Sequence, residues 1–145
     1  MRQHLYLQDD YLKECVELIF YAYNEIYSDP KSVLKKYSFG VAHHRALYLI
    51  ERNKGVSFSE LLIKLKIKKQ SLNRVLKDLI NKKIIYQKND ELDSRRKKIY
   101  LDELGKKFYD EIFNFQRKRI YNALKSSDSD SVKNFKDILK KIISE

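Results

Sequence analysis

The sequence contains few of the residues that interrupt regular secondary structure. Three glycines and one proline occur among 145 residues, and tryptophan is absent. A fold of many short strands joined by tight turns needs more Gly and Pro than this. Hydrophobic residues make up 43% of the chain and aromatic residues 12%, which is enough to form a core. The composition therefore favours a mainly helical protein of one domain, or one protomer of a small oligomer.

Cysteine and long apolar segments are also scarce. Cys15 is the single cysteine, so no intramolecular disulfide can form, and the chain suits a reducing compartment. No apolar run approaches the roughly 20 residues that cross a bilayer. The first residues also lack the hydrophobic segment of a signal peptide. We expect a cytoplasmic protein.

Positive charge is abundant and unevenly distributed. The formal net charge is +11, of which residues 56–101 contribute +8, from thirteen Lys or Arg against five Asp or Glu. Residues 1–55 contribute +1 and residues 102–145 contribute +2. A local basic field predicts a polyanionic partner. The alternative is the Lys-rich composition that an AT-rich genome encodes, but that bias would spread lysines evenly along the chain.

The first third of the chain is predicted to be helical. One wide amphipathic stripe runs from Asp9 to Tyr27, because apolar residues recur there at spacings of three and four. Pro30 suits the first turn of the next helix, over residues 31–36, with Ser28 or Asp29 as its expected cap. A further helix over residues 41–53 ends near Gly55, which is free to take a left-handed conformation.

The basic middle of the chain predicts a winged helix-turn-helix. Ser57 or Ser59 can cap a short helix, and a second helix begins near Lys68 or Lys69 after a tight turn, which is a helix-turn-helix pattern. The β-branched and aromatic runs 84–88 and 98–101 flank a charged segment and predict a β-hairpin. In this element order the second helix enters the major groove of DNA and the hairpin tip reaches the adjacent minor groove.

The fold class that we predict is therefore mainly α with a small β-hairpin wing. Two further helices follow the hairpin; Asp102 caps the first, and the second follows a break at "SSDSDS". These helices and the first one carry apolar faces that a small monomer cannot cover. We expect them to interlock in an isologous dimer. The expected organisation is dimerisation helices over 1–38, a DNA-binding domain over 39–103, and dimerisation helices over 104–145.

The segment "DSRRKKIYLDELG" carries a specific resemblance. It places Asp93, Arg95, Leu101, Asp102 and Gly105 at the spacing of the wing pattern of the MarR family of bacterial transcriptional regulators, which are dimeric winged-helix proteins. Asp102 replaces the usual Thr, and both residue types cap helices well. The segments "AHHRALYLI" and "IKKQSLNRVLKDL" are similar, more narrowly, to the PetP-like branch of the family seen in alphaproteobacteria.

The expected DNA-binding residues lie on the recognition helix and the wing. Amide, hydroxyl and guanidinium groups at the start of the helix can contact base edges, and lysines meet phosphates. Arg95 is the candidate for insertion into the minor groove, with Asp93 orienting it. The full set is Lys68, Lys69, Gln70, Ser71, Asn73, Arg74, Lys77, Arg95, Arg96 and Lys97. The alternative interpretation is a solvated helix face.

Several other residues invite functional interpretations. His43 and His44 are adjacent, so on a helix their side chains diverge by about 100° and favour packing over a shared metal ion. Cys15 lies on the apolar stripe of the first helix, which favours a buried thiol over a peroxide sensor. The tyrosines of that helix fit an effector pocket and interface packing equally well: Tyr11, Tyr21, Tyr23 and Tyr27.

No catalytic constellation, phosphate-binding loop or metal-spaced cluster occurs in the sequence, so we expect neither an enzyme nor a cofactor. The resemblance implies a homodimer that binds a pseudo-palindromic operator in double-stranded DNA. It also implies a repressor by default and a small-molecule effector of unknown identity. The alternatives are a winged-helix protein that binds DNA with little sequence preference, and a winged-helix module that binds another protein.

Overall fold

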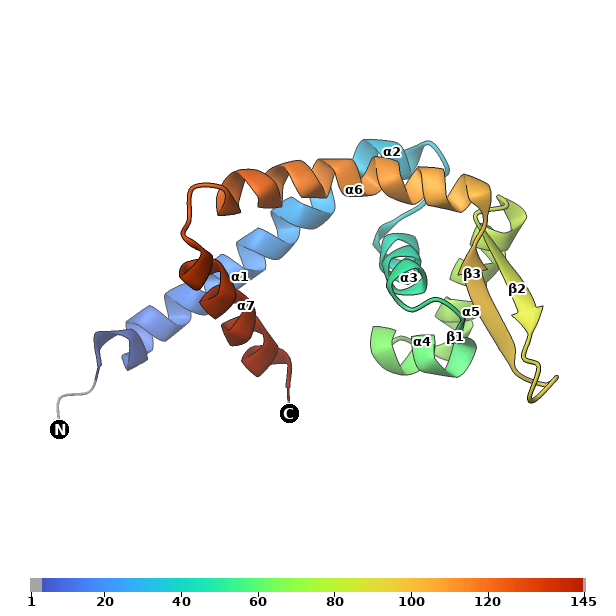
Figure 1. Ribbon diagram of the computed structural model, residues 1–145, viewed down its shortest axis with the longest axis horizontal. Coiled ribbons are helices and arrows are strands. Elements are labelled where there is room, and N and C mark those ends of the chain that lie inside the picture. The colour runs from blue at the N-terminus through green and yellow to red at the C-terminus, as the bar shows by residue number, and fades with distance from the viewer. Residues whose placement is uncertain (1–3, 145) are drawn as a thin grey trace.

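Seven α-helices, a short 3₁₀ turn and a three-stranded antiparallel sheet form the computed structural model, which describes residues 4–144 (Figure 1). The predicted fold class, mainly α with a β-hairpin wing, is confirmed. In chain order the elements are the 3₁₀ turn Leu5–Leu7, α1 (Asp9–Ser28), α2 (Lys31–Lys35), α3 (Val41–Arg52), β1 (Val56–Ser57), α4 (Phe58–Leu65), α5 (Lys69–Asn81), β2 (Ile85–Asn89), β3 (Lys97–Leu101), α6 (Glu103–Leu124) and α7 (Ser129–Ile143).

The hydrophobic core lies where α3, α4, α5 and the sheet meet the first half of α6. Its fully buried side chains come from every one of these elements. Each buried Leu or Ile side chain contributes roughly 1.5–3 kcal/mol through its removal from water. The most completely buried are Leu47, Ile50, Leu61, Leu72, Leu79, Ile84, Ile99 and Ile112.

The sheet has the order β1-β3-β2, with β2 and β3 forming the wing. Tyr86 lies opposite Tyr100, and Gln87 lies opposite Ile99, so alternate side chains face the core. β1 adds two residues to the other edge of β3, with Val56 opposite Ile99. A two-residue strand has no periodicity to detect, and the sequence did not predict it.

Helix α6 is joined directly to the wing at its first turn. Asp102 caps α6 through its Oδ1, which accepts from the backbone N–H of Glu103 at 2.8 Å. The backbone N–H of Asp102 donates to the carbonyl oxygen of Ile84 at 2.9 Å. A Cβ atom on Gly105 would lie only 2.0 Å from that same oxygen. Glycine therefore permits the close approach of α6 to the start of β2.

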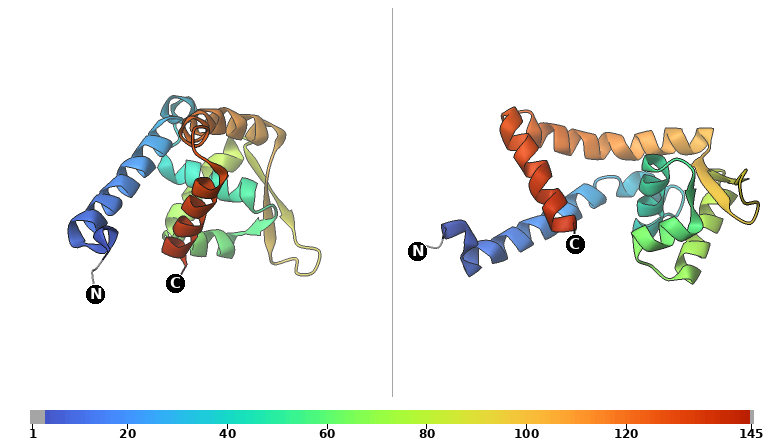
Figure 2. Two further views of the ribbon diagram at one scale, coloured as in Figure 1. Left: turned by 60° about the vertical axis from the view of Figure 1, so that its left-hand side comes forward. Right: turned by 60° about the horizontal axis from the view of Figure 1, so that its bottom comes forward.

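Helices α1 and α7 and the far end of α6 project away from the winged-helix unit (Figure 1; Figure 2, right). Within the described chain, neither α1 nor α7 contains a buried residue. No helix of residues 4–144 combines the length and the apolar character needed to cross a membrane.

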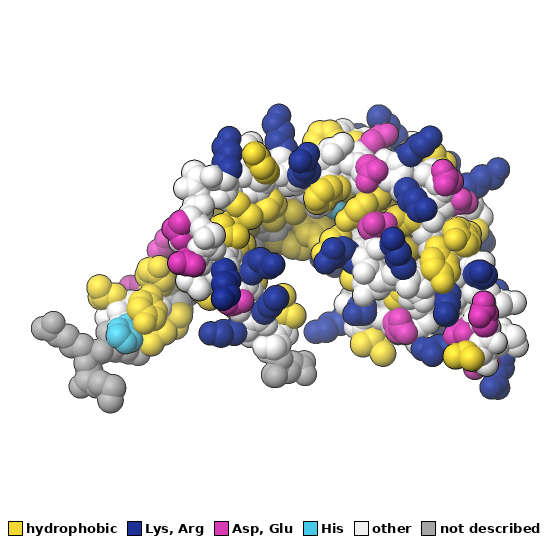
Figure 3. All heavy atoms as spheres, in the orientation of Figure 1, with side chains coloured by type: hydrophobic (Ala, Val, Ile, Leu, Met, Phe, Trp, Pro, Cys, Tyr) yellow, Lys and Arg dark blue, Asp and Glu magenta, His cyan; other side chains and the backbone are white. Residues whose placement is uncertain are grey.

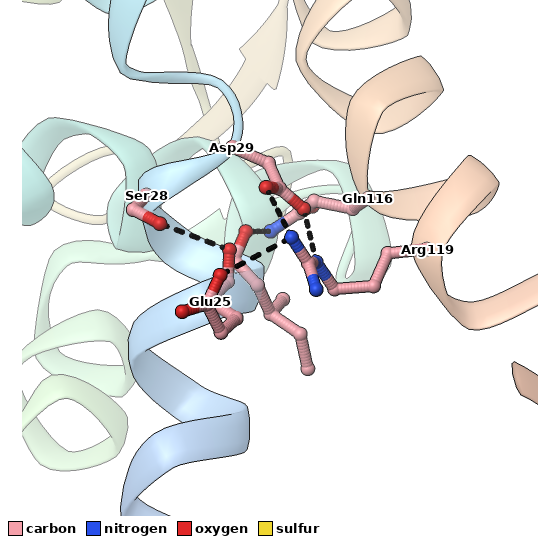
Figure 4. Close-up of polar contacts among 6 residues, drawn as sticks. Glu25, Ser28, Asp29, Gln116 and Arg119 are labelled. Atoms are coloured by element: carbon pink, nitrogen blue, oxygen red, sulfur yellow. Dashed lines mark hydrogen bonds and ion pairs between the residues drawn. The ribbon is translucent and has the colours of Figure 1, made fainter.

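Polar contacts fix the C-terminal end of α1 against α6 (Figure 4). The Arg119 guanidinium donates to both carboxylate oxygens of Asp29, at 2.5 and 2.9 Å, and Gln116 Nε2 donates to the Ile26 carbonyl at 3.2 Å. The expected cap of α2 by Ser28 or Asp29 is wrong, because Pro30 occupies the N-cap position. Ser28 Oγ instead donates to the Glu25 carbonyl.

Candidate nucleic-acid interface

Helix α5 has one buried face and one exposed face, as its sequence predicts. Leu72, Val75, Leu76 and Leu79 are buried in the core. On the opposite side an exposed row of polar and basic side chains follows the helical spacing of three and four. This row consists of Gln70, Asn73, Arg74 and Lys77. The apolar face thus fixes which side chains α5 presents to a ligand.

The N-terminal end of α5 is exposed and positively charged. Lys68 occupies the N-cap position in an extended conformation, and Lys69, Gln70 and Ser71 are exposed in the first turn. Among residues 4–144, no side chain accepts a hydrogen bond from this end, and the first turn contains no acid. The unpaired N–H groups and the positive end of the helix dipole favour an anionic ligand here.

Helix α4 is held at a fixed position beside α5. Ser57 and Glu60 form a capping box at its start, with Ser57 Oγ accepting from the Glu60 N–H at 3.2 Å. Lys66 takes a left-handed conformation, with φ of 53°, and thereby turns the chain sharply into α5. The two helices and this short connection form the helix-turn-helix that the sequence predicts.

The wing tip presents Arg95 to solvent. The Arg95 side chain is 91% exposed. Asp93 Oδ1 accepts from the Arg95 backbone N–H at 3.1 Å and from its Nε at 3.3 Å, so the carboxylate contacts both the main chain and the side chain of Arg95. Leu92, which the sequence did not single out, is 97% exposed at the same tip.

The two basic residues after Arg95 differ in their contacts. Arg96 lies 3.4 Å from Glu60 Oε1, so it ties the wing to the capping box of α4. Its side chain is still half exposed, and Lys97 is exposed on β3. All ten expected DNA-binding residues are therefore exposed, seven of them at or on α5 and three on the wing, and Arg96 also contacts α4.

The adjacent histidines of α3 contact different elements. His43 Nε2 lies 2.9 Å from Asp78 Oδ2 of α5. His44 is buried against α1, where its ring lies 5.0 Å from the Tyr27 ring. Burial lowers the pKa of His44 to about 4, and the neighbouring Gln116 side chain acts weakly in the opposite direction. The Gln116 amide nitrogen itself donates to the Ile26 carbonyl oxygen. Across the described residues, no group of three His, Cys, Asp or Glu side chains is placed to hold a metal ion.

The tyrosines of α1 separate into two groups. Tyr23 and Tyr27 are half-buried with their rings 4.6 Å apart, and Arg45 of α3 donates to the Tyr23 hydroxyl. Burial also raises the pKa of Tyr27. Tyr11 and Tyr21 are exposed on α1. Only the first two tyrosines therefore lie at the junction of α1 with the winged-helix unit.

Comparisons with known proteins agree with this arrangement. A sequence model described as MarR family matches residues 37–96. The HTH-type transcriptional regulator PetP of Rhodobacter capsulatus is 33% identical over 135 residues, covering 93% of this chain and 81% of PetP.

Solved structures share the fold at lower sequence identity. A mutant of MepR from a multidrug-resistant clinical isolate of S. aureus superposes with a TM-score of 0.77 and 18% identity, covering 88% of this chain and 94% of that one. FabT of Streptococcus pneumoniae, solved in complex with DNA, superposes with a TM-score of 0.72 and 14% identity, covering 91% and 94%. With the winged helix-turn-helix in place, the identity to PetP over almost the whole chain shows that this protein belongs to the MarR family of DNA-binding transcriptional regulators.

Proposed function

We propose that this protein acts as a homodimeric repressor that binds a pseudo-palindromic operator in cytoplasmic double-stranded DNA. The observation that carries the proposal is the exposed polar and basic row on α5 together with the exposed Arg95 at the wing tip of the same winged-helix unit. Two recognition elements on one rigid unit fit the successive grooves of a duplex. The structure of FabT, which shares this fold and was solved in complex with DNA, supports the proposal.

The residues take different roles in this proposal. Gln70, Ser71, Asn73 and Arg74 reach base edges in the major groove, because amide and guanidinium groups make bidentate contacts there. Lys68, Lys69, Lys77, Arg96 and Lys97 contact phosphates and make binding dependent on salt. Arg95, oriented by Asp93, enters the minor groove.

A second copy of this chain covers the apolar surface of the arm formed by α1, α7 and the far half of α6. Hydrophobic side chains line the hollow between these helices in Figure 3. These three helices carry many apolar side chains that are 39–70% exposed, which is unusual for so many apolar side chains on one part of a chain. They include Leu12, Val16, Ile19, Phe20, Phe113, Phe115, Ile120, Phe135, Ile138 and Ile142. The proposed three-part organisation follows, with dimerisation segments 1–38 and 104–145 on either side of the DNA-binding segment 39–103.

Sedimentation of the wild-type protein at micromolar concentration tests the dimer. We expect the mass of two chains. In that dimer the two recognition helices should lie about 34 Å apart, which is one turn of DNA. Ile138→Asp on α7 should shift the mass toward one chain, because it places a charge in the covered surface. Ile63→Asp is the matched control, since Ile63 is 75% exposed on α4, outside that surface. A monomeric wild-type protein would contradict the dimer.

DNA binding is tested by selecting bound fragments from the source genome and comparing a selected duplex with a scrambled one at two salt concentrations. Specific recognition requires a ratio of dissociation constants well above ten. Arg95→Ala should weaken binding of the selected duplex by about 1–3 kcal/mol, whereas Lys107→Ala on α6 should leave it unchanged. Affinity that falls with salt but is equal for the selected and scrambled duplexes would instead indicate architectural binding. No binding to either duplex would indicate a protein-interaction module.

The junction around Tyr23, Tyr27 and Arg45 is the place that we propose for a small-molecule effector. An aromatic acid such as benzoate suits it, because Arg45 supplies a positive charge beside two neighbouring rings. Benzoate should release the selected duplex from the wild-type protein and fail to release it from Arg45→Ala. Equal release from both proteins would place the effector elsewhere.

A further inference from the structure

We propose that His43 is a positioning residue that sets the rotation of recognition helix α5 through Asp78, and so contributes to sequence specificity without touching DNA. The inference rests on the proposed function of α5 as the DNA-reading helix. Asp78 lies at a position of α5 that is unfavourable for an acidic residue.

Asp78 is the only acidic residue of α5, a helix that also contains the basic residues Lys69, Arg74 and Lys77. It lies near the C-terminal end, where the negative end of the helix dipole repels a carboxylate. A negative charge on a helix that approaches phosphates also opposes binding. Neither helix stability nor affinity for DNA accounts for an acid at this position. A specific contact does.

That contact is a directed hydrogen bond from α3. The backbone N–H of Gly40 donates to His43 Nδ1 at 3.0 Å, so Nδ1 carries no proton. The proton of the neutral ring therefore resides on Nε2, which donates to Asp78 Oδ2 at 2.9 Å. Each ring nitrogen has one partner, and the chain of bonds runs from the start of α3 to the last turn of α5. The His43 side chain is only 15% exposed, whereas Asp78 is 45% exposed.

The ring itself is held in place from the other side. Phe39 stacks on His43, with ring centroids 4.6 Å apart and planes 16° from parallel. Phe39 in turn packs edge-on against Phe108 of α6, at 5.9 Å. The orientation of the imidazole is thus fixed by α6, the helix that runs from the wing to the arm. The bond to Asp78 transmits this orientation to α5.

Apolar packing selects which face of α5 is exposed, but it constrains the exact rotation of the helix less tightly than a directional bond does, because the hydrophobic effect is not directional. A hydrogen bond constrains both distance and angle. Base-reading contacts need positions accurate to about 0.5 Å and 10–20°. A rotation of about 10° moves the tip of a long side chain on α5 by roughly 1 Å or more. Losing the His43 bond should therefore harm base recognition more than phosphate contact.

The test compares His43→Ala, Asp78→Ala and Asp78→Asn. The measured quantities are the dissociation constants for the genome-selected duplex and for a scrambled duplex, the melting temperature, and the mass of each protein. Asp78→Asn retains an oxygen that accepts from Nε2 and removes only the charge. We expect His43→Ala and Asp78→Ala to lower the selected-to-scrambled ratio at least fivefold. Asp78→Asn should keep the wild-type ratio.

The double variant His43→Ala with Asp78→Ala should be no worse than either single variant, because both remove the same bond. Equal gains of affinity for both duplexes in Asp78→Ala and Asp78→Asn would show that only charge matters and would overturn the proposal. A fall in melting temperature with an unchanged ratio would also overturn it, since the bond would then serve stability alone. If the wild-type protein shows no preference for the selected duplex, the proposed function fails before this comparison begins.

Discussion

Replacing Gly105 with alanine tests how closely α6 must approach the wing. The added Cβ would lie 2.0 Å from the Ile84 carbonyl oxygen, which is backbone and already accepts from the Asp102 N–H. An ordinary contact between carbon and oxygen requires about 3.3 Å. The start of α6 and the first residues of β2 must therefore separate by roughly 1.3 Å. No side-chain rotation can relieve this contact, because the opposing atom belongs to the main chain.

We expect Gly105→Ala to lower the free energy of unfolding by about 3 kcal/mol, the upper part of the range for overpacking. Chemical denaturation at fixed protein concentration measures this change. The direction of the change in unfolding free energy distinguishes a backbone clash from helix propensity, because alanine inside a helix is otherwise favoured over glycine by about 1 kcal/mol. The separation also displaces the wing from α6, so the dissociation constant for the selected duplex should rise in any protein that remains folded.

Gly40→Ala is the matched control. Nothing lies within 4 Å of a Cβ added at Gly40, and its φ of −115° is accessible to any residue. We expect a change of less than about 1 kcal/mol, since only the N-cap preference of α3 is affected. A Gly105→Ala protein as stable as the wild type, or more stable, would refute the argument that backbone contact requires glycine at this position.

Three further changes probe the chain elsewhere. Lys83 takes a left-handed conformation with φ of 58°, which favours glycine. Lys83→Gly should therefore raise the free energy of unfolding by up to about 1 kcal/mol in denaturant titrations, and a loss of stability would contradict this. Burial lowers the pKa of His44 to about 4, whereas the unfolded chain binds this proton near pH 6.5; wild-type stability should therefore fall by up to about 3 kcal/mol as the pH drops between these values. In His44→Phe, that part of the pH dependence should disappear from unfolding curves, and an unchanged slope would exclude His44 as its source. Hydrogen bonds from Arg119 lower the pKa of the Asp29 carboxyl, so its stabilisation is present above about pH 4 and lost at lower pH. Asp29→Asn should accordingly be less stable than the wild type at pH 6 and should lose less stability on acidification to pH 3; parallel losses would exclude this ion pair.

Local patterns in the sequence predicted the parts of the fold that depend on near neighbours. The helix-turn-helix, the hairpin and the Asp102 cap all follow from spacings of a few residues. Contacts between distant residues leave no such pattern. Asp29 was expected to cap α2, but its partner Arg119 lies 90 positions away, and charge pairing prevailed over local capping.

The candidate site shows the same division. The exposed residues of α5 and the wing were predicted from periodicity and charge. The bond between His43 and Asp78 spans 35 positions, and adjacent histidines on a helix gave no signal of it. An isolated acid in a basic recognition helix was the available signal. The need for Gly105 was visible only through resemblance to the family, because its neighbour Ile84 lies in another element.

The contact of α1 with α6 also has a consequence for the chain during its synthesis. The end of helix α1 leaves the ribosome 90 residues before Arg119, the residue that fixes it. At about 5–20 residues per second, this interval lasts roughly 5–20 s. For most of that time the apolar face of α1 has no finished α6 to meet, and the core is also incomplete because it includes Phe108 and Ile112 of α6. The proposed pairing of two chains through α6 therefore has to wait until translation has passed this helix, and a nascent chain stalled earlier exposes the apolar side chains of α1.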